Sequence, residues 1–100
     1  MHLRIADPSG NNPLEFLLAD SLTVAEAADI AAAGHHFHGV FSLGVRDVVL
    51  PRHETELTTD EDGQPIRVPK PLEDYGFYQE TDDGDVQLPV RLVEVGVANR

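Results

Sequence analysis

Only one stretch of the chain has the features of a helix, and this limits the fold more than any other part of the sequence. Thr23 and Glu26 form the T-x-x-E pattern of a capping box, in which each side chain satisfies a free backbone donor of the other residue. The alanine-rich segment that follows, VAEAADIAAA, has a high helix propensity. We expect a helix over about residues 23–33, with Gly34 in the left-handed conformation that ends many helices.

The apolar side chains of this helix form a narrow stripe made of Val24, Ala27, Ile30 and Ala31. Because alanine is small, such a stripe lets a helix lie close to a sheet. We therefore interpret the stripe as a packing surface rather than a partner-binding face.

Outside the helix the chain is divided into short segments in which apolar and polar residues alternate, as in half-buried strands. Residues 3–5 and 14–19 predict a hairpin around the turn-forming PSGNNP. Residues 36–45 predict a strand that directs Phe37 and Phe41 into the core. The remaining expected elements are a strand at RDVVL that stops at Pro51 and two hairpins, 53–68 and 76–97, with the acidic turns DEDG and DDGD.

These elements predict an α+β fold with mostly antiparallel strands. We expect about six to eight short strands in a curved sheet or partly open barrel, with the helix packed on it. At 100 residues the chain is near the commonest size for one domain, so residues 1–100 are interpreted as a single small acidic domain.

Charge is the strongest compositional feature, because 7 basic side chains face 18 acidic ones and the net charge is -11. Such a chain repels nucleic acid and anionic lipid over long range, so we expect no direct nucleic-acid or membrane binding. The natural partners are basic protein surfaces or cations. The alternative is that the charge serves solubility or adaptation to a salty interior.

The chain contains no cysteine, which excludes a disulfide framework, a thiolate metal site and a cysteine nucleophile. Its first residues lack the pattern of a secretory signal, and no apolar run approaches the roughly 20 residues that span a bilayer. We therefore expect an intracellular, cytoplasmic protein, with a virion as the alternative.

Three of the five histidines lie close together in GHHFHGVF, residues 34–41. On a strand, His36 and His38 would share a face about 6.6 Å apart, a spacing at which two imidazoles can converge on zinc, nickel or copper. The candidates for a third ligand are His53, His2 or a carboxylate such as Glu54. The alternative is that these histidines line the outer face of the strand and bind nothing.

No sequence pattern indicates catalysis. The serines lie outside any G-x-S-x-G motif, and no glycine-rich phosphate loop is present. We expect no enzymatic activity and no cofactor.

Surface recognition is the function that remains. Carboxylates gather in the two acidic turns, and aromatic residues beside charge are typical of interface anchors. The candidate partner-binding residues are Asp60, Glu61, Asp62, Asp82, Asp83, Asp85, Tyr75, Phe77 and Tyr78.

We therefore expect a non-enzymatic protein–protein interaction module, for instance one that inhibits or masks a basic nucleic-acid-handling protein. One alternative is a structural subunit of a repeating assembly, such as a virion or tail component, which self-associates through its strand edges. A second alternative is a histidine-based metal-binding protein.

Overall fold

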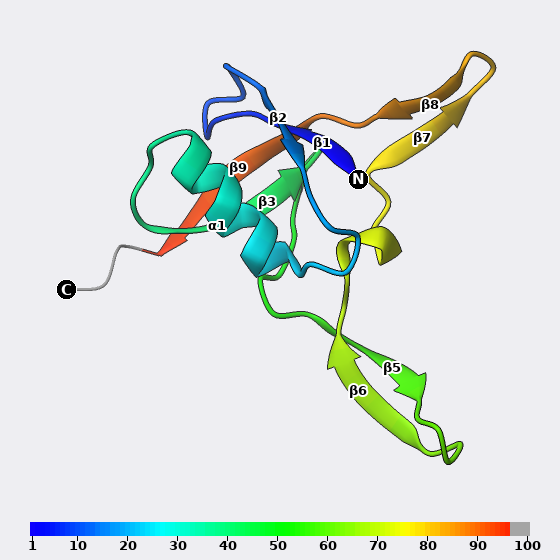
Figure 1. The fold of residues 1–100 in the computed structure, drawn as a ribbon. Coiled ribbons are helices and arrows are strands. Elements are labelled where there is room, and N and C mark those ends of the chain that lie inside the picture. The colour runs from blue at the N-terminus through cyan, green and yellow to red at the C-terminus, as the bar shows by residue number, and fades with distance from the viewer. Residues whose placement is uncertain (97–100) are drawn as a thin grey trace.

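The structure is a computed structural model of the chain, and it describes residues 1–96. These residues contain one α-helix, one short 3-10 helix and nine short strands, which confirms the predicted α+β class (Figure 1). The strands form several small, mostly antiparallel sheets that do not close into a barrel. In chain order the elements are β1 (His2–Ile5), β2 (Leu14–Leu17), α1 (Val24–Gly34), β3 (Val40–Val45), β4 (Val48–Val49), β5 (Thr55–Thr59), β6 (Pro65–Pro69), η1 (Leu72–Asp74), β7 (Tyr78–Thr81), β8 (Gly84–Gln87) and β9 (Val90–Gly96).

The centre of the fold is a layer of five strands. β3 pairs antiparallel with β4 and β9, and β1 pairs antiparallel with β2. The two groups meet where Ala6, just after β1, forms a parallel bridge with Arg91 in β9. The Ala6 amide donates to the Val90 carbonyl, and the Leu92 amide donates to the Ala6 carbonyl, both at 2.9 Å. The strands therefore lie in the order β2, β1, β9, β3, β4, with the two inner neighbours β1 and β9 parallel.

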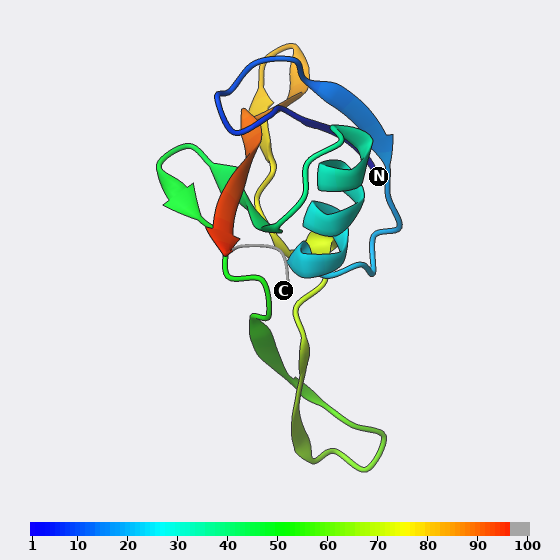
Figure 2. The same cartoon turned by 90° about the vertical axis from the view of Figure 1, so that its left-hand side faces the viewer.

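Helix α1 crosses one face of this layer and packs on β3 and β9 (Figure 2). Its buried face consists mostly of alanine, as the sequence predicted, so the helix lies close to the strands. Ile30 is the exception to the predicted stripe, because its side chain is 43% exposed. The buried cluster contains Leu3, Ile5, Leu18, Val24, Ala27, Ala28, Ala31, Ala32, Phe41, Leu43, Leu72, Phe77, Val90 and Leu92.

The two ends of α1 differ in how well the sequence predicted them. The capping box is confirmed: the Glu26 amide donates to Thr23 Oγ1 at 3.2 Å, and the Thr23 amide donates to Glu26 Oε1 at 3.0 Å. The prediction for Gly34 is wrong, because Gly34 is the last helical residue and the positive φ of 63° belongs to His36. Gly34 is instead required by close packing, since a Cβ there would lie 2.7 Å from the Phe16 ring.

The strand predicted over residues 36–45 begins only at Val40. His36 and His38 lie in the loop before it, so the shared strand face proposed for them does not exist. Phe41 enters the core as expected, at 2% exposure, but Phe37 is 41% exposed. The left-handed residue at His36 turns the chain before the strand starts, and the alternating pattern of the sequence gave no sign of this turn.

The two later hairpins are present, with one change in extent. β5 pairs with β6 as expected for residues 53–68, and β7 pairs with β8 around the second acidic turn. The segment 76–97 is not one hairpin, however, because β8 ends before Leu88 and β9 pairs with β3 instead. Pro89 has no amide hydrogen to continue a ladder, which explains the break. Val97, the last residue expected in this segment, lies outside the described residues.

Both of these hairpins project from the central layer (Figures 1 and 2). The radius of gyration, 14.6 Å, exceeds the roughly 13 Å of a compact domain of this length because of these arms. An isolated two-stranded hairpin is at best marginally stable in water. The arms are therefore the parts of the fold that gain most from contact with another molecule.

Candidate functional site

The β7–β8 hairpin carries a dense group of carboxylates on its projecting end. Glu80 and Asp85 are direct cross-strand partners, and Asp82 and Asp83 form the turn between them. All four side chains are exposed. Like charges placed directly opposite each other on a hairpin are destabilising. The tip is therefore a negatively charged surface with an unfavourable arrangement that a cationic group from outside would relieve.

The base of the same hairpin is held against β1 by side chains. Gln87 Oε1 accepts from the backbone amide of Arg4, and Gln87 Nε2 donates to the backbone carbonyl of Arg4, both at 2.8 Å. The Tyr78 hydroxyl donates to the His2 carbonyl. These bonds use backbone groups on the side of β1 that faces away from β2. They therefore fix the direction in which the acidic end projects.

The β5–β6 tip contributes fewer free carboxylates than the sequence predicted. Asp60 Oδ1 accepts from the amides of Asp62 and Gln64 at 2.9 and 2.8 Å, so this carboxylate shapes the turn. Glu61 and Asp62 are exposed and make no side-chain hydrogen bond within residues 1–96. Of the three carboxylates predicted as partner-binding residues at this tip, two are thus exposed and free of side-chain hydrogen bonds within residues 1–96, and one shapes the turn.

A cluster of charged groups joins the β5–β6 arm to the core. Lys70 Nζ lies 3.2 Å from Glu54 Oε2 and 4.3 Å from the centre of the Tyr75 ring. A hydrogen bond with Asp74 raises the pKa of Glu56 above its ordinary value. Burial, with the nearby Glu54 and Glu56 carboxylates, raises the pKa of Tyr75. Lys70, the single lysine of the chain, balances a group of acids at the root of the arm.

The three aromatic residues predicted as interface anchors fall into different environments. Phe77 is 1% exposed and belongs to the core, so its prediction as an exposed residue is wrong. Tyr75 is half-buried beneath Lys70. Tyr78 is 41% exposed at the base of the acidic hairpin. Tyr78 is thus the member of the set that a partner of this hairpin would meet.

The histidines do not form a metal site in the part of the chain that the structure describes. His36 and His38 line a shallow groove beside Asp29 and Arg52. Within residues 1–96 no three histidine or carboxylate side chains gather closely enough to hold a metal ion, and His53 does not complete a set with the other two. The nearby carboxylate of Asp29 forms an ion pair with Arg52, with 2.9 Å between Asp29 Oδ1 and Arg52 Nη1.

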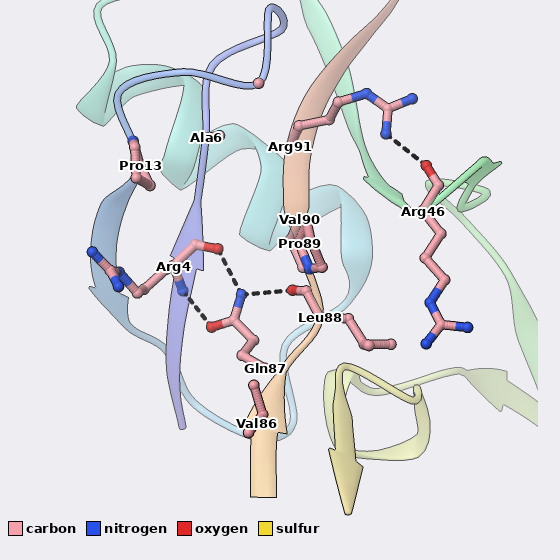
Figure 3. Close-up of a pocket in the computed structure, with 11 residues that line it drawn as sticks. Arg4, Ala6, Pro13, Arg46, Val86, Gln87, Leu88, Pro89, Val90 and Arg91 are labelled. Carbon is pink, nitrogen blue, oxygen red and sulfur yellow. Dashed lines mark hydrogen bonds between the residues drawn. The ribbon is translucent and has the colours of Figure 1, made fainter. Parts of the chain in front are cut away.

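A second concavity lies elsewhere, and the sequence did not predict it. It lies between β1, the β8–β9 connection and the β3–β4 turn, has a volume of about 580 Å³, and includes Arg4, Arg46 and Arg91 in its lining (Figure 3). We call it the arginine groove. These arginines are far apart in the sequence. The alternation of the strands around Arg4 and Arg91 indicated only that these two side chains point away from the core.

The turn after β1 contains a strongly hydrogen-bonded carboxylate. Asp7 accepts from the hydroxyl and amide of Ser9, from the Asn11 amide and from the Asn12 side chain. These bonds, the Ser9 hydroxyl first, lower the pKa of Asp7 from 3.8 to about 2. They hold in place the loop that follows β1 and leads toward β2.

We expect this turn to make folding stability sensitive to acid. Because the pKa of Asp7 is lower in the folded state, its stabilisation is complete above about pH 4 and is lost as the pH falls from there towards 2. Urea unfolding of the wild type and of Asp7→Asn should show a difference that shrinks across this range. A difference that stays constant with pH would contradict the assignment, and an NMR titration of the Asp7 carboxyl checks the pKa directly.

No family model, curated protein sequence or solved structure matches the chain. Among residues 1–96 no helix is long and apolar enough to cross a lipid bilayer.

Proposed function

We propose that the protein is a non-enzymatic protein–protein interaction module that binds a basic surface of another protein through its projecting acidic hairpins. The observation that carries this proposal is the tip of β7–β8, where Glu80 and Asp85 face each other across the strands beside Asp82 and Asp83. This arrangement costs stability in the free protein. A basic partner would convert the repulsion into attraction, and the net charge of -11 would steer it from a distance.

The same surface offers more than charge. In the pleat of β7–β8, Tyr78, Glu80, Asp85 and Gln87 lie on one face, because side chains alternate along each strand. Tyr78 supplies an aromatic contact at one end of this face, and aromatic residues are enriched at the energetic centres of interfaces. Glu61 and Asp62 on the other arm provide a second acidic contact. A nucleic-acid-binding groove of an enzyme is one surface of the required charge, which makes inhibition or masking a concrete form of the function.

Salt dependence of binding tests this proposal. The immobilised protein should retain basic proteins from its host's lysate at low ionic strength, and raising the salt should release them because exposed charges are then screened. A parallel column with Glu80→Gln/Asp85→Asn should retain markedly less of the same proteins. If both columns retain the same proteins at low and high salt, the acidic hairpin does not bind them.

Self-assembly is the second candidate function, and the strand edges of the arms favour it. Within residues 1–96, β5 and β6 pair only with each other, so each has an edge that no other described strand covers. Leu57 is 65% exposed and Ile66 is 39% exposed on this hairpin. Edges of this kind can be completed by strands of neighbouring copies, as in a structural subunit of a repeating assembly. A mass that rises with concentration in light scattering supports this function, and a constant monomer mass excludes it.

A further inference from the structure

The arginine groove differs in charge from the rest of the molecule. Three of the six arginines of the chain, Arg4, Arg46 and Arg91, contribute to its lining. No aspartate or glutamate of residues 1–96 lines it, although acids outnumber bases 18 to 7 in the chain. A concave basic surface on so acidic a protein is opposite to what solubility requires.

Two of the three guanidinium groups are held by hydrogen bonds to uncharged acceptors. Arg91 Nη1 donates to the Arg46 carbonyl at 2.8 Å, and Arg46 Nη2 donates to Gln79 Oε1 at 3.3 Å. Arg4, Arg46 and Arg91 form no ion pair within 4 Å of a carboxylate among residues 1–96. Glu15, the cross-strand partner of Arg4, lies against His2 instead. By contrast, Arg52 and Lys70 each pair with a carboxylate.

The arginines lie on two sides of an apolar segment. Figure 3 shows Arg4 on one side of Leu88–Pro89 and both Arg46 and Arg91 on the other. The lining between them is largely apolar and includes Ala6. The segment is held in place from β1, because Gln87 bonds both the amide and the carbonyl of Arg4. The groove therefore has two basic sides and an apolar middle.

We propose that the arginine groove binds a small organic dianion, with an oxyanion group at each end and an apolar chain between them. The guanidinium of Arg4, which Figure 3 shows turned away from Leu88–Pro89, would swing toward the groove to bind one end. Those of Arg46 and Arg91 would bind the other, since the planar guanidinium matches a carboxylate or phosphate in two-point contact. The apolar chain would lie over Leu88–Pro89. The volume of about 580 Å³ is within the usual range for small-molecule sites. This site is separate from the acidic tips.

Calorimetric titration with straight-chain dicarboxylates of increasing length tests the site. We expect affinity to rise from succinate to a preferred longer member, and the monocarboxylate of the same length to bind more weakly. Arg4→Gln and Arg46→Gln should each weaken binding of the preferred dicarboxylate by roughly tenfold or more, because each removes a charged hydrogen-bond donor. Arg67→Gln, an equal change in charge on the distant strand β6, should leave the affinity unchanged.

Three results would overturn the proposal. One is equal loss of affinity in Arg67→Gln, which would indicate a general effect of net charge. Another is binding of inorganic phosphate as tight as that of any dicarboxylate, since the groove would then recognise a single oxyanion. The third is a concentration-dependent rise in mass that Arg4→Gln and Arg46→Gln abolish, because the occupant would then be an acidic tip of a second copy. Unchanged urea midpoints of the variants show that they remain folded.

Discussion

Replacing Phe77 with alanine should lower the free energy of unfolding by about 3–5 kcal/mol, as expected for loss of a buried aromatic side chain. The Phe77 ring is 1% exposed and packs beside Tyr75, with 5.9 Å between the ring centres. Its backbone carbonyl also accepts from the Leu88 amide at 2.8 Å, where the chain leaves the acidic hairpin. The buried ring thus anchors the start of the β7–β8 arm to the core, and the backbone bond joins the end of the arm to the same residue. Urea denaturation followed by circular dichroism measures the effect.

Tyr78→Ala is the matched control, because it removes an aromatic ring from the adjacent residue, which is 41% exposed. We expect it to cost about 1 kcal/mol or less, mainly through the lost hydrogen bond to the His2 carbonyl. A Phe77→Ala variant with the wild-type urea midpoint would contradict the assignment of Phe77 to the core. Such a variant with reduced partner binding would restore Phe77 as the interface anchor that the sequence suggested.

The contrast between Thr23 and Phe77 shows which features the sequence could predict. The capping box at Thr23 and Glu26 is local, since both partners lie within one helical turn, and it forms as expected. The hairpin β1–β2 is also local, because a short turn-forming segment sets its pairing. Phe77 is buried through contacts with distant parts of the chain, so its neighbours along the sequence gave only the composition of an exposed aromatic segment.

The candidate sites divide in the same way. The acidic tips were predicted because the residues that form each hairpin turn and carry its charge are consecutive in the sequence. The arginine groove was not, because Arg4, Arg46 and Arg91 come together only through the pairing of β9 with β3 and its bridge to β1. The histidine site failed for a local reason, a single left-handed residue at His36 that ends the alternation on which the prediction depended.

Removing the charge of one cross-strand pair at the acidic tip should change binding and stability in opposite directions. In Glu80→Gln/Asp85→Asn, the affinity for a basic partner should fall by about tenfold or more at low salt, because electrostatic attraction accelerates association by factors of about 10 to 1,000. The free energy of unfolding should stay constant or rise by less than about 1 kcal/mol, since the repulsion between the two strands is removed. Surface plasmon resonance with the captured partner and urea denaturation measure the two quantities.

Asp47→Asn/Glu73→Gln is the control, because it removes two exposed carboxylates elsewhere and leaves the same net charge. If only the net charge of the molecule attracts the partner, both double variants should lose affinity equally. If the tip is the contact, the control should bind nearly as well as the wild type. A tip variant that is less stable than the wild type would mean that Glu80 and Asp85 serve the fold. A gain in stability joined to a loss of binding is expected where residues are kept for function at the expense of folding.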